Sequence, residues 1–280
     1  MILILGAQGM LGGEFRRTFS RALGWDRAEL DLAQAENLEE RIRGLGEKVT
    51  AVINCAAYNN VDAAEQHKEL AFAINAEAVG KIAAVCKKLD VPFLHFSTNY
   101  VFDGEKGEYR EADQPNPLSI YAQSKFEGEK LLQKNCDKYY LIRTSVLFGH
   151  EAQSEFAKKS FIEIMLELSQ KTGTIKAVND EINSLTYVSD LAKTVELLIT
   201  KKYPYGIYHV VNSGEASWYD LAKEIFSATD KKINLVPVPA SEFPRPARRP
   251  KRAVLLNTKL PALRSWQAAL HEFLKNNRTF

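Results

Sequence analysis

The first twelve residues constrain the fold of this chain more than any other stretch. Residues 2–5 form an apolar run that ends at Gly6, and residues 11–23 then show the apolar spacing of a helix. A short apolar run that feeds a tight turn is typical of a buried parallel strand. Gly6, Gly9 and Gly12 let the backbone approach a ligand, and a helix N-terminus offers free amides to a pyrophosphate. The stretch predicts a dinucleotide-binding unit; the alternative is a plain strand–helix turn, because G-x-x-G-x-x-G differs from G-x-G-x-x-G.

Strand and helix patterns alternate over the first half of the chain. Apolar runs at 49–57, 92–98 and 139–149 are typical of strands, and residues 70–89 have the spacing of a long amphipathic helix. Such alternation predicts an α/β fold of the Rossmann type, a doubly wound parallel sheet with helices on both faces.

The alternation breaks down after residue 149. We therefore expect an NAD(P)-binding domain over 1–149 and mainly a smaller substrate-binding lobe over 150–280, with segments near 187–212 returning to the sheet. The chain of 280 residues, 45% of them apolar, is long enough to bury the cores of such a domain and lobe.

Composition argues against several classes of protein. The net charge is +2 and the only local basic excess is 245–252, so we expect no nucleic-acid partner. No apolar run approaches the roughly 18 residues of a membrane span. Three scattered cysteines and five histidines without ligand spacing predict neither a disulfide framework nor a metal site. These features, and a first segment unlike a signal peptide, predict a cytoplasmic protein.

The residues after the expected second strand indicate which dinucleotide cofactor the chain binds. An acidic residue there commonly accepts a hydrogen bond from the adenosine ribose, and an adjacent arginine can accommodate a 2′-phosphate. Asp26 and Arg27 stand in this position, and Asp31 and Leu32 are placed near the adenine. The sequence therefore predicts NADPH or NADH; the alternative for Asp26 and Arg27 is a pair of exposed loop charges.

A tyrosine and a lysine four residues apart suggest the chemistry. The helix expected just past Pro117 carries Tyr121, Lys125 and Glu129 on one face, although such spacing also arises on an ordinary surface helix. A ketone that accepts a hydride needs a proton, and a lysine ammonium one turn away can lower the pKa of a tyrosine that gives it. Thr98, at the end of a strand, would orient the carbonyl, unless it is merely a turn cap.

These residues carry a resemblance to the extended short-chain dehydrogenases/reductases, and within them to the dTDP-4-dehydrorhamnose reductase family. The matching stretches occur in family order over nearly the whole chain: 4–12, 54–65, 74–79, 97–104, 119–130, 141–149, 186–192, 206–226 and 247–260. The resemblance implies NAD(P)H-dependent reduction of the 4-keto group of a dTDP-linked, or other nucleotide-linked, 6-deoxy sugar for surface polysaccharides. Relatives often form dimers, so a homodimer is one expectation.

The resemblance also implies roles for particular residues. Thr98, Tyr121 and Lys125 would form the catalytic set, and Arg249 lies where relatives close over the nucleotide. The cofactor would be lined by Gly6, Gln8, Gly9, Met10, Leu11, Gly12, Ala56, Ala57 and Tyr58.

The chain departs from the family pattern at the substrate crevice. Asn99 replaces an Asp, Val146 replaces a Trp, and Glu181, Asn183 and Leu185 replace Gln, Gly and Pro. We expect Asn99, Val146 and Glu181 to meet the substrate, in a roomier and less acidic pocket.

Two alternatives stay open at this point. One is a nucleotide-sugar 4-epimerase or dehydratase with retained NAD, although Asn99-Tyr100 replaces the Asp-Glu pair of a dehydratase. The other is a non-catalytic NADP-binding regulatory subunit, against which the intact Thr/Tyr/Lys set argues.

Overall fold

A computed structural model describes residues 1–34, 37–45, 48–154 and 159–277. The described residues form a six-stranded parallel sheet in the order β11-β6-β4-β3-β1-β2. The chain adds β2 on one side of β1 and β3 on the other, which is the topological switch point of a Rossmann sheet. The strand bounds are β1 Ile2–Leu5, β2 Ala22–Trp25, β3 Ala51–Asn54, β4 Phe93–Thr98, β6 Tyr139–Thr144 and β11 Gly206–His209.

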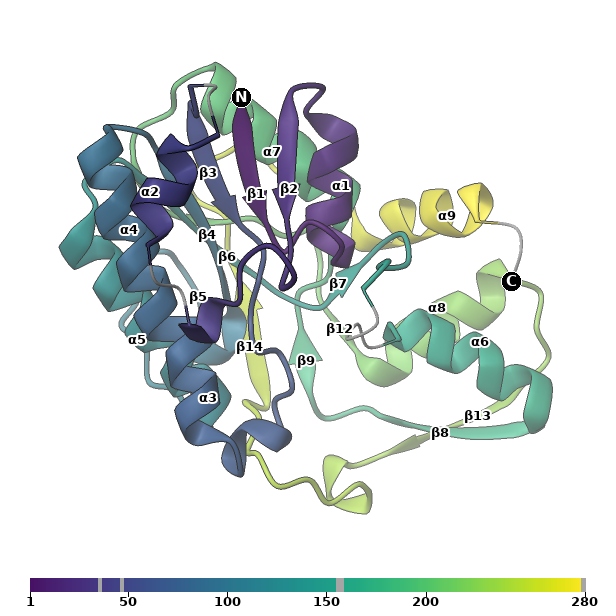
Figure 1. Ribbon diagram of the computed structural model, residues 1–280. Helices are drawn as coiled ribbons and strands as arrows, with labels where there is room; N and C mark the ends of the chain where they lie inside the picture. The colour runs from purple at the N-terminus through teal and green to yellow at the C-terminus, as the bar shows by residue number, and fades with distance from the viewer. Residues whose placement is uncertain (35–36, 46–47, 155–158, 278–280) are drawn as a thin grey trace.

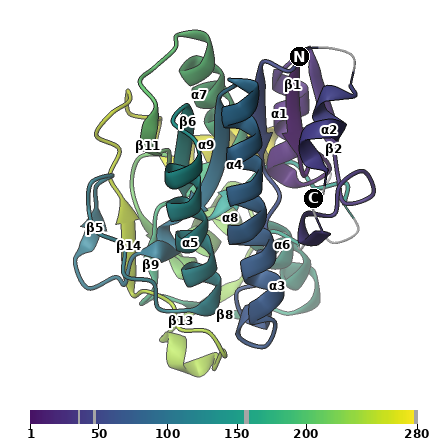
Figure 2. The same cartoon turned by 60° about the vertical axis from the view of Figure 1, so that its left-hand side comes forward.

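Helices cover both faces of this sheet, because its strands are apolar on both sides. On one face α1 (Met10–Thr18) and α7 (Val188–Thr200) share a core with the strands. On the other, α2 (Leu38–Arg43), α4 (Ala78–Leu89) and α5 (Ile120–Asn135) do so, and α4 and α5 lie side by side in Figure 2. Short helices link these elements: η1 Leu32–Gln34, η2 Ala63–Glu65, α3 Lys68–Phe72, the π-helical η3 Ala73–Glu77 and η4 Asn99–Val101.

A smaller layer with its own core lies beyond the carboxyl ends of the strands (Figure 1). Helices α6 and α8 each begin with a capping box, whose N-cap residues are Ser160 and Ser217. The elements of this layer are β7 Leu147–Phe148, α6 Phe161–Lys171, β8 Thr174–Val178, β10 Thr186–Tyr187, α8 Trp218–Ala228, β13 Asn234–Val238, η5 Ala240–Glu242 and α9 Trp266–Asn276.

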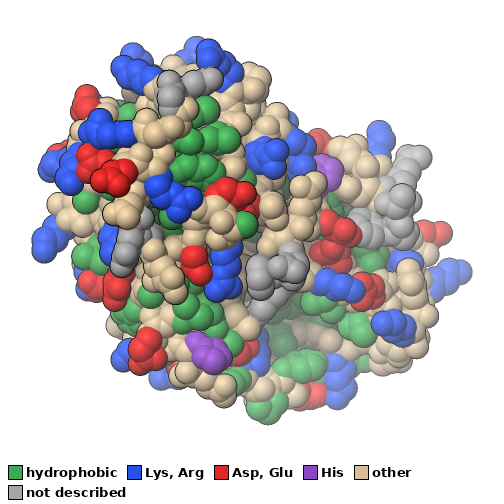
Figure 3. Space-filling model, viewed as in Figure 1, with side chains coloured by type: hydrophobic (Ala, Val, Ile, Leu, Met, Phe, Trp, Pro, Cys, Tyr) green, Lys and Arg blue, Asp and Glu red, His purple; other side chains and the backbone are tan. Residues whose placement is uncertain are grey.

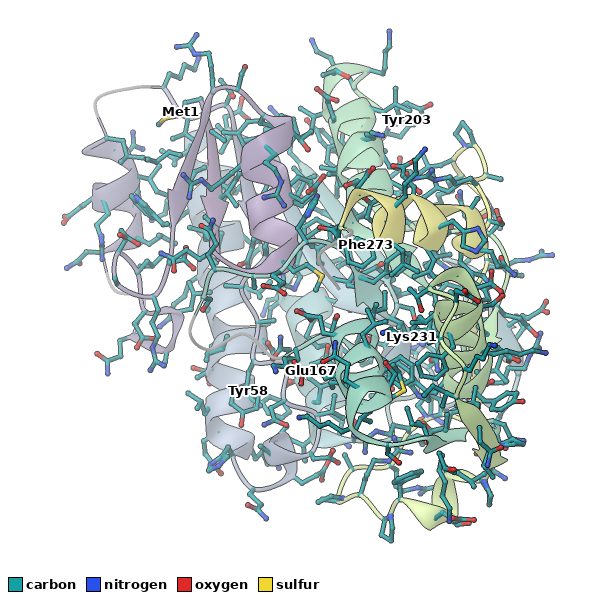
Figure 4. The ribbon with its side chains drawn as sticks, turned by 90° about the vertical axis from the view of Figure 1, so that its right-hand side faces the viewer. Met1, Tyr58, Glu167, Tyr203, Lys231 and Phe273 are labelled. Carbon is teal, nitrogen blue, oxygen red and sulfur yellow. The ribbon has the colours of Figure 1, made fainter. Side chains whose placement is uncertain are left out.

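A second small sheet joins the two layers. It has the order β12-β9-β14-β5, with bounds β12 Ala216–Ser217, β9 Ile182–Asn183, β14 Arg252–Leu255 and β5 Gly107–Tyr109. Figure 4 shows Met1, before β1, and Tyr58, after β3, at opposite ends of the main sheet. The chain segments that follow β3 and β4 therefore begin at the end of the sheet that faces the smaller layer.

The surface agrees with the balanced composition. Basic and acidic side chains are interspersed over the described part of the face drawn in Figure 3. Among the described residues, no helix combines the length and the apolar character needed to cross a membrane.

Candidate active site

The glycine loop between β1 and α1 folds tightly against the end of β3. Gly6 has a φ of +75°, and a Cβ there would lie 2.7 Å from the amide nitrogen of Ala56. A Cβ on Gly12 would lie 2.1 Å from the carbonyl oxygen of Gly6, so a side chain at either position would collide with backbone. Gly9 is the N-cap of α1, and no described side chain caps the first turn, which leaves its amides available to an anion. The loop fits a pyrophosphate.

Asp26 follows β2 and contacts the glycine loop directly. Its Oδ2 accepts the N–H of Gln8 at 2.8 Å, and burial raises the pKa of its carboxyl group. Arg27 and Asp31 form an ion pair of 3.3 Å in which the arginine side chain is 64% exposed. Leu32 is buried. The structure thus brings Asp26 to the loop and leaves Arg27 at the adjacent surface.

Asn75 fixes the loop that contains Ala56, Ala57 and Tyr58. Its side-chain amide accepts the N–H of Tyr58 and donates to the carbonyl of Tyr58, both at 2.9 Å. The same amide donates to Ser124 on α5 at 3.0 Å. Asn75 lies in the π-helical turn η3, a local structure often found at functional sites. Sequence reasoning missed it, although a buried asparagine within an apolar helical pattern was the available signal.

Tyr121 and Lys125 lie one turn apart at the start of α5. The helix begins at Ile120, just past Pro117 as the sequence predicts, and Ser119 caps it by accepting the N–H of Ala122. The Tyr121 hydroxyl is hydrogen-bonded to Thr98. Lys125 is buried.

Lys125 is held in place by groups of strand β4. Its Nζ donates to the carbonyl of Phe96 at 2.6 Å and lies 3.4 Å from Nε2 of His95. Glu129, on the same helical face, forms a fully buried ion pair with Arg143, with N···O distances of 3.0 and 2.7 Å. The structure therefore brings together Thr98, Tyr121 and Lys125, and sequence reasoning missed His95.

The predicted effect of Lys125 on Tyr121 is not the dominant one. Desolvation raises the pKa of Tyr121 to about 12, and the hydrogen bond with Thr98 offsets this only in part. Burial likewise lowers the pKa of Lys125 to about 8, against a raising effect of Glu129. Desolvation, rather than the charge of Lys125, is therefore the largest effect on the pKa of Tyr121 in this arrangement.

Asn99 is buried and faces other protein groups. Its Nδ2 donates to Oδ1 of Asn183 at 2.8 Å and to the carbonyl of Ala253 at 3.0 Å. These bonds connect the end of β4 to β9 and β14. The Asn99 amide is thus engaged in joining the two layers, and Asn183 is its partner.

Val146 has an unusual backbone for a β-branched residue. Its φ is +37°, in the region that side chains branched at Cβ rarely adopt. Its carbonyl accepts the N–H of Thr186 at 3.1 Å, which helps to hold this conformation at the border of the smaller core. Strain of this kind persists only where the surroundings impose it, and it often accompanies functional sites. No pattern in the sequence indicates it.

Tyr100 and several charged side chains lie next to Tyr121. The ring of Tyr100 meets that of Tyr121 edge-on, with centroids 6.4 Å apart, and its phenol is hydrogen-bonded to Arg249. Glu181 is buried, pairs with Arg245 and accepts a bond of 3.3 Å from the indole N–H of Trp218. Sequence reasoning named Glu181 and Arg249 but missed Tyr100 and Arg245.

Known proteins resemble this chain over its whole length. A family model described as RmlD substrate binding domain matches residues 1–279. A dTDP-4-dehydrorhamnose reductase of Burkholderia thailandensis is 33% identical, over 92% of this chain and 91% of that protein. The crystal structure of a dTDP-4-dehydrorhamnose reductase from Clostridium acetobutylicum is 34% identical and superposes with a TM-score of 0.92, covering 99% of each chain. A Bacillus anthracis dTDP-4-dehydrorhamnose reductase in complex with NADP is 32% identical, with a TM-score of 0.92 and 98% coverage of both chains. The chain therefore belongs to the RmlD substrate-binding domain family.

Proposed function

We propose that this protein is an NADPH-dependent reductase of the 4-keto group of a dTDP-linked 6-deoxy sugar. The observation that carries the proposal is the convergence of Thr98, Tyr121 and Lys125 at the carboxyl end of β4. Family membership, and the NADP named with one close structural neighbour, support the cofactor and the substrate class.

The chain offers a cradle for the dinucleotide. The glycine loop, the uncapped start of α1 and Asp26 fit a pyrophosphate and an adenosine ribose, and the exposed Arg27 suits a 2′-phosphate. The residues proposed to hold the cofactor are Gly6, Gln8, Gly9, Met10, Leu11, Gly12, Asp26, Arg27, Asp31, Leu32, Ala56, Ala57, Tyr58, Tyr121 and Lys125.

Residues of β4 and α5 donate the proton and orient the carbonyl group of the substrate. The bound cofactor supplies the hydride. Tyr121 gives its phenolic proton to the carbonyl oxygen, and the raised pKa keeps that proton on the tyrosine until the oxygen becomes basic. Thr98, in hydrogen-bond contact with Tyr121, orients the same oxygen. Arg249, paired with Asp62, holds the 245–252 segment on the side proposed for the diphosphate, and Val146 and Glu181 border the sugar.

We also propose a cellular location and an oligomeric state for the protein. The three cysteines are free thiols, in keeping with a cytoplasmic location. A homodimer is expected from the resemblance, and light scattering during gel filtration tests it.

The test is the stoichiometry of cofactor consumption over dTDP-, GDP- and UDP-linked 4-keto sugars. A reductase consumes one NADPH for each sugar reduced, with the dTDP compounds preferred. Turnover without net loss of nicotinamide absorbance would instead identify an epimerase or dehydratase. Tight NADPH binding without turnover of any sugar would identify a non-catalytic subunit.

A further inference from the structure

The side chain of Arg16, on α1, lies across β2 close to the residue that follows this strand. A Cβ on Gly24 would lie 3.1 Å from Cδ of Arg16 and 3.6 Å from its Nε, so the arginine stem crosses β2 where a glycine leaves room. β2 is an edge strand of the main sheet, and α1 lies beside it in Figure 1. Gly24 is two residues before Asp26, which is roughly 7 Å along a strand. Arg16 is thus placed near the end of β2, where a dinucleotide-binding sheet receives the adenosine ribose.

The geometry of α1 directs this side chain toward the glycine loop. Each Cα–Cβ bond of a helix is tilted toward the helix N-terminus, and α1 begins at the glycine loop. The charges agree with this direction. Burial raises the pKa of the Asp26 carboxyl group, the N–H of Gln8 and the charge of Arg16 lower it, and the charge of Glu29 raises it. Arg16 therefore lies within electrostatic range of the carboxylate expected at the ribose.

The guanidinium of Arg16 has no partner among the residues that the structure describes. It is exposed, and no hydrogen bond or ion pair joins it to another described side chain or carbonyl. The neighbouring arginines differ: Arg17 pairs with Glu14 at 3.0 Å, and Arg41 lies over the ring of Trp25, 5.4 Å from its centroid. Arg16 thus keeps its N–H donors available to a ligand at the end of β2.

The loop after β2 needs an additional positive charge if a phosphate is to bind there. Residues 26–31 carry three carboxylates and one arginine, a formal net charge of −2. That arginine, Arg27, is itself paired with Asp31 at 3.3 Å. A phosphate monoester carries about −1.5 to −2 charge at neutral pH, so this loop alone would repel it. Arg16 brings a positive charge from outside the loop, and a guanidinium can bind two phosphate oxygens at once.

We infer that Arg16 determines the cofactor specificity of this protein by binding, together with Arg27, the adenosine 2′-phosphate of NADPH. This role rests on the proposed function for the identity of the cofactor. One of the two arginines comes from α1 and the other from the loop after β2, and Asp26 keeps its bond of 2.8 Å to the N–H of Gln8. NADPH is therefore preferred to NADH, although an acidic residue stands where NAD-binding sheets commonly carry one.

The experiment is isothermal titration calorimetry of the whole protein with two probes, adenosine 2′,5′-bisphosphate and adenosine 5′-monophosphate. The probes differ only in the 2′-phosphate, and we expect the wild type to bind the bisphosphate more tightly. Arg16→Ala should weaken the bisphosphate by about tenfold, the scale of a charge-assisted hydrogen bond, and leave the monophosphate unchanged. Combining Arg16→Ala with Arg27→Ala should abolish the difference between the two probes.

Two matched variants separate the charge of Arg16 from its packing and its position. Arg16→Met keeps an apolar stem over Gly24 without the charge, and it should lose as much affinity for the bisphosphate as Arg16→Ala. Arg17→Ala removes the neighbouring arginine, which pairs with Glu14, and should bind both probes as the wild type does. Wild-type affinity for the bisphosphate in Arg16→Ala or in Arg16→Met would overturn the inference. An equal loss for both probes would overturn it as well.

The titration needs no sugar substrate, so its result is separate from that of the proposed reaction. Loss of bisphosphate affinity in Arg16→Ala, in a protein that reduces no keto sugar, would refute the proposed reaction and support the role of Arg16. Reduction of a dTDP-linked 4-keto sugar with equal use of NADH and NADPH would support the reaction and refute the role of Arg16.

Discussion

Arg249 holds Asp62 with both terminal guanidinium nitrogens, Nη1 and Nη2, at N···O distances of 2.8 and 2.7 Å. The pair joins the segment before β14 to the loop that follows β3, two stretches 187 residues apart. Asp62 also accepts the N–H of Ala247 at 3.2 Å, and Arg249 donates to the carbonyl of Ala247 at 2.7 Å. Both terminal nitrogens of Arg249 are thus occupied by one carboxylate, and the pair ties the 245–252 segment to the loop after β3.

Removing either partner of this pair should loosen the segment. We expect Arg249→Ala and Asp62→Ala each to raise the KM for the sugar nucleotide several-fold, with little change for NADPH. The double variant should be no worse than the single ones, because the two residues act as a unit. Steady-state kinetics with each substrate varied in turn gives both KM values for the wild type and for each of the three variants. A lower KM in Asp62→Ala would mean instead that Arg249 binds the diphosphate once it is released.

Two adjacent glycines of α1 provide a matched test of the dinucleotide loop. Gly12→Ala should destabilise the protein by about 3 kcal/mol or more, the upper end of overpacking costs, because its Cβ would meet the carbonyl oxygen of Gly6. Gly13→Ala should be neutral or stabilising by up to about 1 kcal/mol, since its Cβ would lie 3.8 Å from the nearest oxygen, that of Ala7. Urea unfolding measures both. Equal effects would contradict the tight packing of the loop.

Arg27 should distinguish the two nicotinamide cofactors. Its side chain is 64% exposed and pairs with Asp31, so it can turn to a 2′-phosphate at small cost. We expect Arg27→Ala to weaken NADPH binding by about tenfold, on the scale of a charge-assisted bond, and to leave NADH nearly unchanged. Fluorescence titration gives both dissociation constants. An equal loss for the two cofactors would remove Arg27 from the 2′-phosphate.

His209 should make the protein less stable in mild acid. It is fully buried, and burial lowers its pKa to about 4 from an ordinary 6.5. The unfolded chain therefore takes up a proton before the folded one, so this stability is present above pH 6.5 and is lost as the pH falls towards 4. The loss should reach roughly 3 kcal/mol, and His209→Gln should lack this part of the pH dependence. Urea unfolding over that pH range would show parallel curves for the two proteins if the assignment were wrong.

Local signals made much of the fold predictable from the sequence. The run at 2–5 and the glycines after it indicate β1, its turn and α1, and the pattern after Pro117 places the start of α5. Each of these depends on residues close together in the chain. The parallel sheet follows, because alternating strands and helices leave few other ways to bury both faces.

Contacts across long stretches of sequence could not be predicted in the same way. Asn99 bonds to Ala253 and Arg249 to Asp62, and no periodicity links the members of either pair. The dominance of desolvation at Tyr121 likewise depends on how deeply the helix start is packed, which spacing on one helix does not reveal. The positive φ of Val146 falls on a β-branched residue, a type for which the sequence predicts no such backbone.

The rate of NADPH oxidation by Tyr121→Phe, with a dTDP-4-keto-6-deoxy sugar at saturation, tests the central claim most directly. The variant lacks only the phenolic hydroxyl, so it should fold, bind NADPH as the wild type does and lose at least about a hundredfold in turnover, the usual scale of general acid catalysis. Turnover within a few-fold of the wild type, with NADPH binding intact, would contradict the role of Tyr121 as the proton donor.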